Sequence, residues 1–189
     1  MATKGIHRRG LSSGVLTFRP ATPADVPFLV PLVESAYRGT GADAGWTTES
    51  HLIGGQRTDE AAVLEAITTS TVLIGLRDAE PVACCQVAVE DGAGYFGLFA
   101  VSPKLQGEGL GSVVLAEAER YAAQELGMPE MRMKVVSARE DLIAWYVRRG
   151  YARTGRTSPF PYGDERFGIP RVPDLVFETL VKPLPSGAS

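Results

Sequence analysis

The sequence VSPKLQGEGLGSVVLAEAE occupies residues 101–119 and places three glycines, at positions 107, 109 and 111, directly before a pattern typical of a helix. An apolar run, YFGLFAV at residues 95–101, precedes these glycines. Glycine lets the backbone adopt positive φ angles and lets another group approach closely. The loop is therefore either a flexible joint or a site where an anion meets the free N–H groups that begin a helix.

Two familiar phosphate-binding loops fit this stretch poorly. A nucleotide P-loop has the pattern GxxxxGK[ST], but the residue directly before Ser112 is a glycine, not a lysine. A dinucleotide loop has the pattern GxGxxG in the first βαβ unit of its fold, whereas these glycines are spaced GxGxG and lie deep in the chain. The pattern that remains is QxxGxG, from Gln106 to Gly111.

The composition is that of an ordinary soluble globular protein, with 44% hydrophobic and 22% charged residues among 189. The net charge of −3 argues against general nucleic-acid binding, which needs clustered Lys and Arg. Cys84 and Cys85 are adjacent, so no disulfide framework is indicated. No run approaches the ~20 apolar residues of a membrane helix, and no secretory signal is evident. We expect a cytoplasmic protein with no nucleic-acid, membrane or metal partner.

Hydrophobic periodicity predicts one α/β domain over residues 15–184, with polar tails at 1–14 and 185–189. The first helix should begin with Thr22 as its N-cap and Pro23 at its first position, and Pro31 should bend it. Three more helices are expected, over residues 59–68, 109–126 and 140–149. The expected strands are 15–19, 71–77, 81–90, 95–101, 131–136, 151–157 and 174–181. The strand at 95–101 has no polar alternation, which predicts burial on both faces.

The QxxGxG loop resembles the pyrophosphate loop of the GNAT superfamily of acyl-CoA N-acyltransferases. RPATPAD at residues 19–25 resembles the family's entry into its first helix, and LIAWYVRRGY at 142–151 resembles its helix-to-strand signature. The resemblance spans nearly the whole chain. It implies a central mixed, mostly antiparallel sheet of about seven strands flanked by about four helices. It also implies that the sheet is splayed between its fourth and fifth strands.

The resemblance implies acetyl-CoA as a co-substrate, bound in the splayed gap. The pantetheine arm is expected along the edge of Phe99, Ala100 and Val101. Arg139 stands where the family often has an asparagine that touches the pantetheine, so it is a further cofactor candidate. The residues expected to hold the pyrophosphate are Gln106, Gly107, Glu108, Gly109, Leu110, Gly111 and Ser112.

Tyr146 matches the family's tyrosine, three variable residues before Gly150. We expect Tyr146 to act as the general acid toward the CoA thiolate, because a phenol stays protonated at neutral pH. The general base is unassigned, since the chain has Gly97 and Leu98 where many relatives carry a carboxylate. The candidate bases, none of them preferred, are Glu49, Glu90, Asp164 and Glu165.

Acceptor selection in this fold usually involves two segments, GWTTESHLIGG at residues 45–55 and SPFPYGDERFG at 158–168. We expect acetyl transfer to a primary amine of a small molecule, by direct attack in a ternary complex. A protein or peptide N-acetyltransferase and a non-catalytic acyl-CoA sensor are the alternatives. The sequence leaves the acceptor, the acyl chain and the oligomeric state open, and a homodimer is compatible with it. The candidate acceptor residues are Trp46, Glu49, Phe160, Tyr162 and Asp164.

Overall fold

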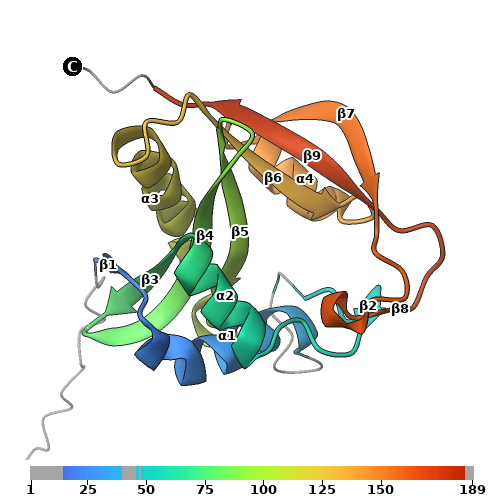
Figure 1. The fold of residues 1–189 in the computed structure, drawn as a ribbon, viewed down its shortest axis with the longest axis horizontal. Coiled ribbons are helices and arrows are strands. Elements are labelled where there is room, and N and C mark those ends of the chain that lie inside the picture. Colours follow the sequence, from blue (N-terminus) through green and yellow to red (C-terminus); the bar gives the residue numbers. More distant parts are fainter. Residues whose placement is uncertain (1–14, 40–45, 47, 186–189) are drawn as a thin grey trace, which may run out of the picture.

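The computed structural model describes residues 15–39, 46 and 48–185, so the expected tail at 1–14 and residues 186–189 lie outside it. Within the described residues, seven strands form one sheet in the order β1-β3-β4-β5-β6-β9-β7, with helices on both faces (Figure 1). The strands of the sheet are β1 (Thr17–Pro20), β3 (Thr71–Arg77), β4 (Glu80–Glu90), β5 (Ala93–Val101), β6 (Glu130–Val136), β7 (Ala152–Pro159) and β9 (Val176–Pro183). The helices are α1 (Val26–Arg38), α2 (Glu60–Thr69), α3 (Leu110–Gln124) and α4 (Glu140–Val147).

The strand pairing confirms the expected mixed, mostly antiparallel sheet. All neighbours in the sheet are antiparallel except β5 and β6, which are parallel. The element bounds agree with the predicted ranges to within about two residues, the usual uncertainty of helix and strand ends. No helix in the part of the chain that the structure describes is long and apolar enough to cross a membrane.

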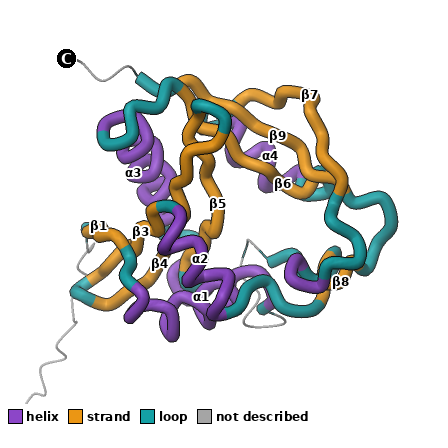
Figure 2. The backbone as a smooth tube through the Cα atoms, viewed as in Figure 1, coloured by secondary structure: helices purple, strands orange, loops and turns teal. Residues whose placement is uncertain are grey.

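The two parallel strands separate soon after they meet. β5 and β6 pair only through Gly94 with Met131 and Tyr95 with Arg132. Beyond Tyr95, β5 continues to Val101 while β6 turns away from it, and Figure 2 shows the two halves of the sheet diverging. The splay that the resemblance implies between the fourth and fifth strands is therefore present.

The helices form two separate cores on opposite faces of the sheet. Val114 of α3 and Ile143 of α4 belong to one buried cluster, which includes residues of β4, β5, β6 and β9. Leu29 and Val33 of α1 belong to a second cluster with residues of α2, β3 and β4. The first cluster contains side chains from both sides of the splay, so it holds the two halves of the sheet together.

A bulge interrupts β5 where the two strands have parted. The register between β4 and β5 shifts between Cys84 and Gln86. Leu98 has a φ of 45°, a backbone conformation that residues other than glycine rarely adopt. At Gly97, an added Cβ would lie 2.9 Å from the Tyr95 ring and 3.2 Å from the Gln86 amide oxygen. A side chain at position 97 would therefore require the Tyr95 ring and the Gln86 amide to move. The expected burial on both faces holds for Phe96 and for residues 99–101, while Tyr95, Gly97 and Leu98 are half-buried.

A second, two-stranded sheet was not predicted from the sequence. β2 (Ile53–Gly54) pairs with β8 (Ile169–Pro170). This pairing joins the connection between α1 and α2 to the connection between β7 and β9, which lie far apart along the chain (Figure 1). Two residues per strand are too few to produce a recognisable alternation in sequence.

The first helix begins at a capping box. The backbone N–H and the hydroxyl of Thr22 both donate to Asp25 Oδ2, at 2.8 and 3.0 Å. Arg19 donates two further hydrogen bonds to the same carboxylate, at 2.9 and 2.7 Å. A 3-10 turn at Pro23–Asp25 leads into α1, which continues through Pro31 to Arg38. The hydrogen bonds from Arg19 hold the pKa of Asp25 well below its usual range.

We expect Asp25→Ala to lower the free energy of unfolding by ~1 kcal/mol at neutral pH, the usual effect of losing a helix cap. The folded-state pKa of Asp25 lies below its ordinary value of 3.8. Its contribution is therefore present above pH 3.8 and is lost as the pH falls through the folded-state pKa. Urea denaturation at neutral pH and at about pH 2 should show the difference between wild type and variant shrinking. An equal difference at both pH values would contradict this account.

Candidate functional site

The glycine loop presents open backbone at the start of α3. Gly107 and Gly109 have φ angles of 89° and 81°, and a Cβ at either position would meet no atom within 4 Å. Gly109 is the N-cap of α3, and the first turn of this helix contains no acidic residue. The glycines are thus needed for backbone conformation, and the space beside them is free. Free N–H groups at a helix start, with no carboxylate in the first turn, suit an anion.

Two side chains of the loop are turned away from this open backbone. The Gln106 amide donates to the Val101 carbonyl at 3.2 Å and accepts a hydrogen bond from the backbone N–H of Trp46. Glu108 accepts a hydrogen bond from Arg77 Nη1 at 2.7 Å. Gln106 therefore closes the loop, and the charge of Glu108 is balanced by Arg77 of β3.

A cavity of about 440 Å³, here called the loop cavity, lies beside the glycines. Besides residues of the loop, Phe99, Val101, Trp46, Trp145 and Arg149 line it. The Arg149 guanidinium lies 3.6 Å from the Trp145 ring centre. Arg149 also donates to Ser112 Oγ, at 2.7 Å from Nη2 and 3.0 Å from Nε. These contacts place a cation next to the open backbone of the loop.

Trp145 and Arg149 were not identified from the sequence. They stand four residues apart in and just after α4, so they lie on the same face of that helical turn. The spacing was visible in LIAWYVRRGY, but only the packing of α4 against α3 shows that this face meets Ser112. Trp145 in turn packs against Phe99 and Trp46, with ring centres 6.3 and 5.4 Å apart.

On the edge of β5 where the pantetheine arm is expected, two carbonyl oxygens already accept hydrogen bonds from side chains of the protein. The Tyr37 hydroxyl donates to the Phe99 carbonyl at 2.7 Å, and Gln106 donates to that of Val101. A carbonyl oxygen has two lone pairs and can accept a second hydrogen bond. A ligand along this edge would share these oxygens or use the strand's N–H groups. Ala100 is buried on the opposite face, against α1 and α2.

A second cavity, of about 550 Å³, is here called the Tyr146 cavity. Tyr146 of α4, Tyr37 and Arg38 of α1, and Gly97 and Leu98 at the bulge line it. Phe99 lines both this cavity and the loop cavity, so the two lie on either side of that residue.

Tyr146 is 4% exposed, with its ring against those of Trp145, Phe96 and Tyr151. Burial is the main cause that raises the pKa of Tyr146 well above its ordinary value, and Tyr37 and Glu49 raise it further. The phenol therefore stays protonated throughout the neutral range. Within the described residues the hydroxyl has no hydrogen-bond partner, which leaves its proton available to a ligand.

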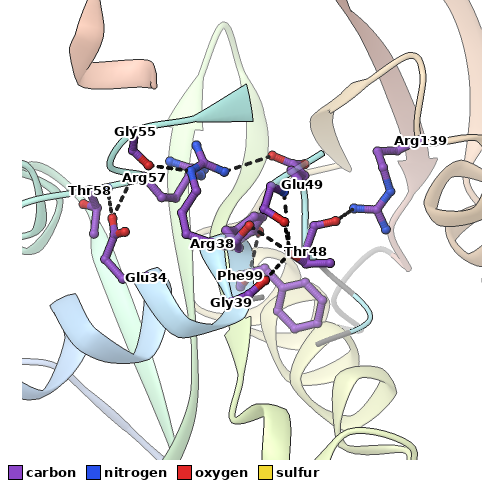
Figure 3. A network of polar contacts seen from close by, with 12 residues as sticks. Glu34, Arg38, Gly39, Thr48, Glu49, Gly55, Arg57, Thr58, Phe99 and Arg139 are labelled. Atoms are coloured by element: carbon purple, nitrogen blue, oxygen red, sulfur yellow. Dashed lines mark hydrogen bonds and ion pairs between the residues drawn. The ribbon is translucent and has the colours of Figure 1, made fainter. Parts of the chain in front are cut away.

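Glu49 is the one sequence-identified carboxylate that lines the Tyr146 cavity in the described part of the chain. Its residue is 7% exposed, and Oε2 lies 3.9 Å from Arg38 Nη1 (Figure 3). Burial raises the pKa of Glu49, while Arg57, Arg139 and Arg38 act to lower it. A buried carboxylate with a raised pKa, held at the edge of a cavity, is suited to accept a proton.

Arg139 holds the segment that carries Glu49. Its guanidinium donates to the Thr48 carbonyl at 3.1 Å (Figure 3). It also donates to the Trp46 carbonyl at 2.9 Å and forms two hydrogen bonds with Asp141. Only 3% of the residue is exposed. The contact of Arg139 with a cofactor stays a prediction, and the structure shows that Arg139 links the start of α4 to Trp46 and Thr48.

The other predicted acceptor residues are divided among different places. Phe160 is buried and lines the Tyr146 cavity, whereas Trp46 lines the loop cavity. Tyr162 is half exposed, and its hydroxyl accepts from Leu175 N and donates to the Val172 carbonyl, so it holds its own loop. The structure gives the positions of these residues, and their role in binding the acceptor stays a prediction.

The remaining candidate bases lie away from Tyr146. Asp164 forms hydrogen bonds with Arg166 beside an exposed 3-10 turn that contains Glu165. Glu90, at the end of β4, lines a separate depression between β5 and β6. Within the described residues, no group of three or more His, Cys, Asp or Glu side chains could hold a metal ion.

Tyr37, Arg38 and Arg57 were also not identified from the sequence. Arg38 ends α1, where a basic side chain is normally read as a partner for the helix dipole. The Arg57 guanidinium lies 4.8 Å from the centre of the Tyr37 ring. Both arginines reach the Tyr146 cavity because β2 and β8 close over the end of α1, which periodicity could not predict.

Comparison with known proteins agrees with this geometry. A sequence model of the Acetyltransferase (GNAT) family matches residues 43–151, more than half of the chain. No curated protein sequence matches the chain significantly.

Several solved structures are similar. The ribosomal-protein-S18-alanine N-acetyltransferase from Escherichia coli is 16% identical, with a TM-score of 0.66 over 93% of this chain and 97% of that one. The structure of yncA from Salmonella typhimurium with its cofactor acetyl-CoA is 18% identical, with a TM-score of 0.62 over 93% and 97%. A spermidine N-acetyltransferase SpeG chimera from Vibrio cholerae and hSSAT is 12% identical, with a TM-score of 0.63 over 89% and 95%.

At these identities the structural likeness shows the fold. The sequence match goes further, since it covers the glycine loop, Tyr146 and the strands on both sides of the splay. The chain therefore belongs to the GNAT family of acetyltransferases.

Proposed function

We propose that this protein transfers an acetyl group from acetyl-CoA to the primary amine of a small molecule, by direct attack in a ternary complex. The observation that carries the proposal is that Tyr146 and Glu49 line one cavity, which shares the lining residue Phe99 with the loop cavity. A volume of about 550 Å³ is within the usual range for small-molecule sites. Ile53 of β2 and Phe167 from the β7–β9 connection line its wall, which favours an enclosed acceptor over a long peptide.

Acetyl-CoA supplies a thioester, whose C–S bond breaks as the amine nitrogen forms the new C–N bond. The amine must lose one proton and the departing sulfur must gain one. Glu49 is the group we assign to take the amine proton, directly or through a water. Tyr146 donates its hydroxyl hydrogen bond to the sulfur as negative charge develops there.

The raised pKa of Tyr146 limits how far its own proton moves. A free thiol has a pKa of ~8.5, below that of the buried phenol. Tyr146 therefore stabilises the thiolate mainly by hydrogen bonding, and the proton that the thiol finally carries comes from Glu49 or from solvent. The glycine loop and Arg149 would bind the phosphates of the donor.

Replacement of Tyr146 by phenylalanine tests the donor role. We expect Tyr146→Phe to lower kcat by about 10²-fold, near the lower end for a lost proton donor. The KM for acetyl-CoA should change little. Thiol release from acetyl-CoA measures both. Tyr151→Phe is the matched control, because Tyr151 packs against Tyr146 but its hydroxyl bonds Glu119 outside the cavity. A Tyr146→Phe enzyme with unchanged kcat would rule out the assignment.

Replacement of Glu49 by glutamine tests the base. Glu49 acts when deprotonated, and burial raises its pKa above the ordinary 4.5. With rates expressed per concentration of neutral amine, kcat/KM should therefore fall as the pH drops through that raised pKa. Glu49→Gln should lower kcat/KM by about 10²-fold and remove this acidic limb. Glu165→Gln, at an exposed position, is the control. An acidic limb that persists in Glu49→Gln would assign the proton transfer to another group.

Replacement of Gly109 by alanine tests the donor site. A side chain at a φ of 81° strains the loop, although the added Cβ itself meets open space. We expect the Kd for CoA to rise roughly 10-fold, as loop N–H groups lose their alignment with the phosphates. Gly155→Ala, at a φ of 70° on β7 and also facing open space, imposes similar strain away from the loop. Calorimetric titration with CoA should separate the two, and equal affinities would contradict the phosphate role of the loop.

A further inference from the structure

Arg38 has a guanidinium whose two outer nitrogens make no hydrogen bond to the residues that the structure describes. Its side chain is 10% exposed, and Nε donates to the Gly55 carbonyl at 3.0 Å (Figure 3). Nη1 and Nη2 are buried and have no hydrogen-bond partner within the described residues. The nearest carboxylate oxygen, of Glu49, is 3.9 Å from Nη1, beyond hydrogen-bond distance. Buried donors normally have partners, so this fork of two nitrogens fits a ligand that supplies two oxygens.

The charges of the Tyr146 cavity point the same way. Its lining contains three basic side chains, of Arg38, Arg57 and Lys134, and a single acidic one, of Glu49. The whole chain, by contrast, carries a net charge of −3. A positive cavity repels an ammonium group and attracts an anion. An amine that enters this cavity is therefore favoured when it carries a negative group of its own.

The rest of the cavity wall is apolar. Phe96, Phe99, Phe160, Phe177 and Leu142 all line it. A ligand that fills this volume gains from burying an apolar body against these side chains. The cavity thus combines a cationic fork, one carboxylate and an aromatic wall.

We propose that the acceptor is a small amino acid-like molecule, with an oxyanion bound by Arg38, an amino group directed to Glu49 and an apolar side chain. This inference rests on the proposed acetyl transfer, because it names the substrate class of the same site. The short separation of Arg38 and Glu49 suits an amine and an acid on the same carbon atom. Arg57 and Lys134 add to the positive potential that draws the acid in.

A series of matched acceptors tests the proposal. Phenylalanine carries the acid, whereas phenylalaninamide and 2-phenylethylamine keep the amine and the ring without it. The phosphonate analogue of phenylalanine separates a carboxylate site from a general oxyanion site. We expect kcat/KM for thiol release to be roughly 10- to 100-fold higher with phenylalanine than with either neutral analogue, in line with two charge-assisted hydrogen bonds. A phosphonate that is equal or better would also support the oxyanion site.

Arg38→Gln separates charge recognition from stability. We expect this variant to lower kcat/KM for phenylalanine roughly 10- to 100-fold more than kcat/KM for 2-phenylethylamine, mainly through KM, so that the preference for the acid is largely lost. Arg120→Gln removes a charge on the outer face of α3, where Arg120 pairs with Glu117 and Glu125, and is the control. Equal losses for both acceptors would mean that Arg38 only holds Gly55 and Glu49, which would overturn the proposal.

A binding measurement keeps the proposal independent of turnover. N-acetylphenylalanine and N-acetyl-2-phenylethylamine are titrated calorimetrically into the protein with CoA present. Tighter binding of N-acetylphenylalanine that depends on Arg38 supports the oxyanion site. It supports this site even if no amine releases thiol, because the absence of thiol release would contradict only the proposed acetyl transfer. Turnover of all amines with no preference for the acid would support the transfer and overturn the inference. Equal turnover of the dipeptide Phe-Ala, whose carboxylate lies farther from its amine, would also overturn it.

Discussion

The early parting of two parallel strands underlies every functional feature of this fold. β5 and β6 share two residue pairs, so the rest of the β5 edge has no strand partner there within the described chain. Buried backbone groups need hydrogen bonds, and an open edge inside a sheet is normally costly. Here Tyr37 and Gln106 each donate to one carbonyl of that edge. β9 pairs with β6 from Glu130 to Val136, and α3 and α4 share a core with both halves, so the gap persists without collapse of the sheet.

Two adjacent residues of α4, Trp145 and Tyr146, line different cavities in the gap between β5 and β6. They do so because consecutive side chains of an α-helix point about 100° apart. On the Trp145 side, polar recognition comes from the open backbone at Gly107 and Gly109, with Arg149 beside it. On the Tyr146 side, it comes from buried side chains. Backbone N–H groups on the first side suit a phosphate, and a single carboxylate among cations on the second suits proton transfer.

The sequence predicts the features that depend on local rules. The glycine loop, the helix that follows it and the spacing of Tyr146 to Gly150 are contiguous patterns, and the structure has the predicted strands within about two residues. Glu49 could only be named as one of four carboxylates, because its burial depends on Arg139, ninety residues farther along the chain. Arg38 was not identified at all. Its position at the end of α1 has a sufficient local explanation, and its contacts with Gly55 and Gly168, beside the paired strands β2 and β8, are not visible in the sequence.

The position of Glu49 has a consequence for its basicity. The two positions of β5 where many relatives carry a carboxylate are Gly97 and Leu98 in this chain. The carboxylate that we propose as the base, Glu49, is on the opposite wall, where Arg38 is 3.9 Å away and acts to lower its pKa. An oxyanion bound to Arg38 would offset that positive charge and add a negative one nearby, and both effects raise the pKa of Glu49. An acidic acceptor would thus make Glu49, the proposed base, better able to accept the proton of the acceptor's amino group. A neutral amine would leave Glu49 under the influence of Arg38. In the proposed reaction, a single pair of side chains would therefore couple recognition of the acid to activation of the amine.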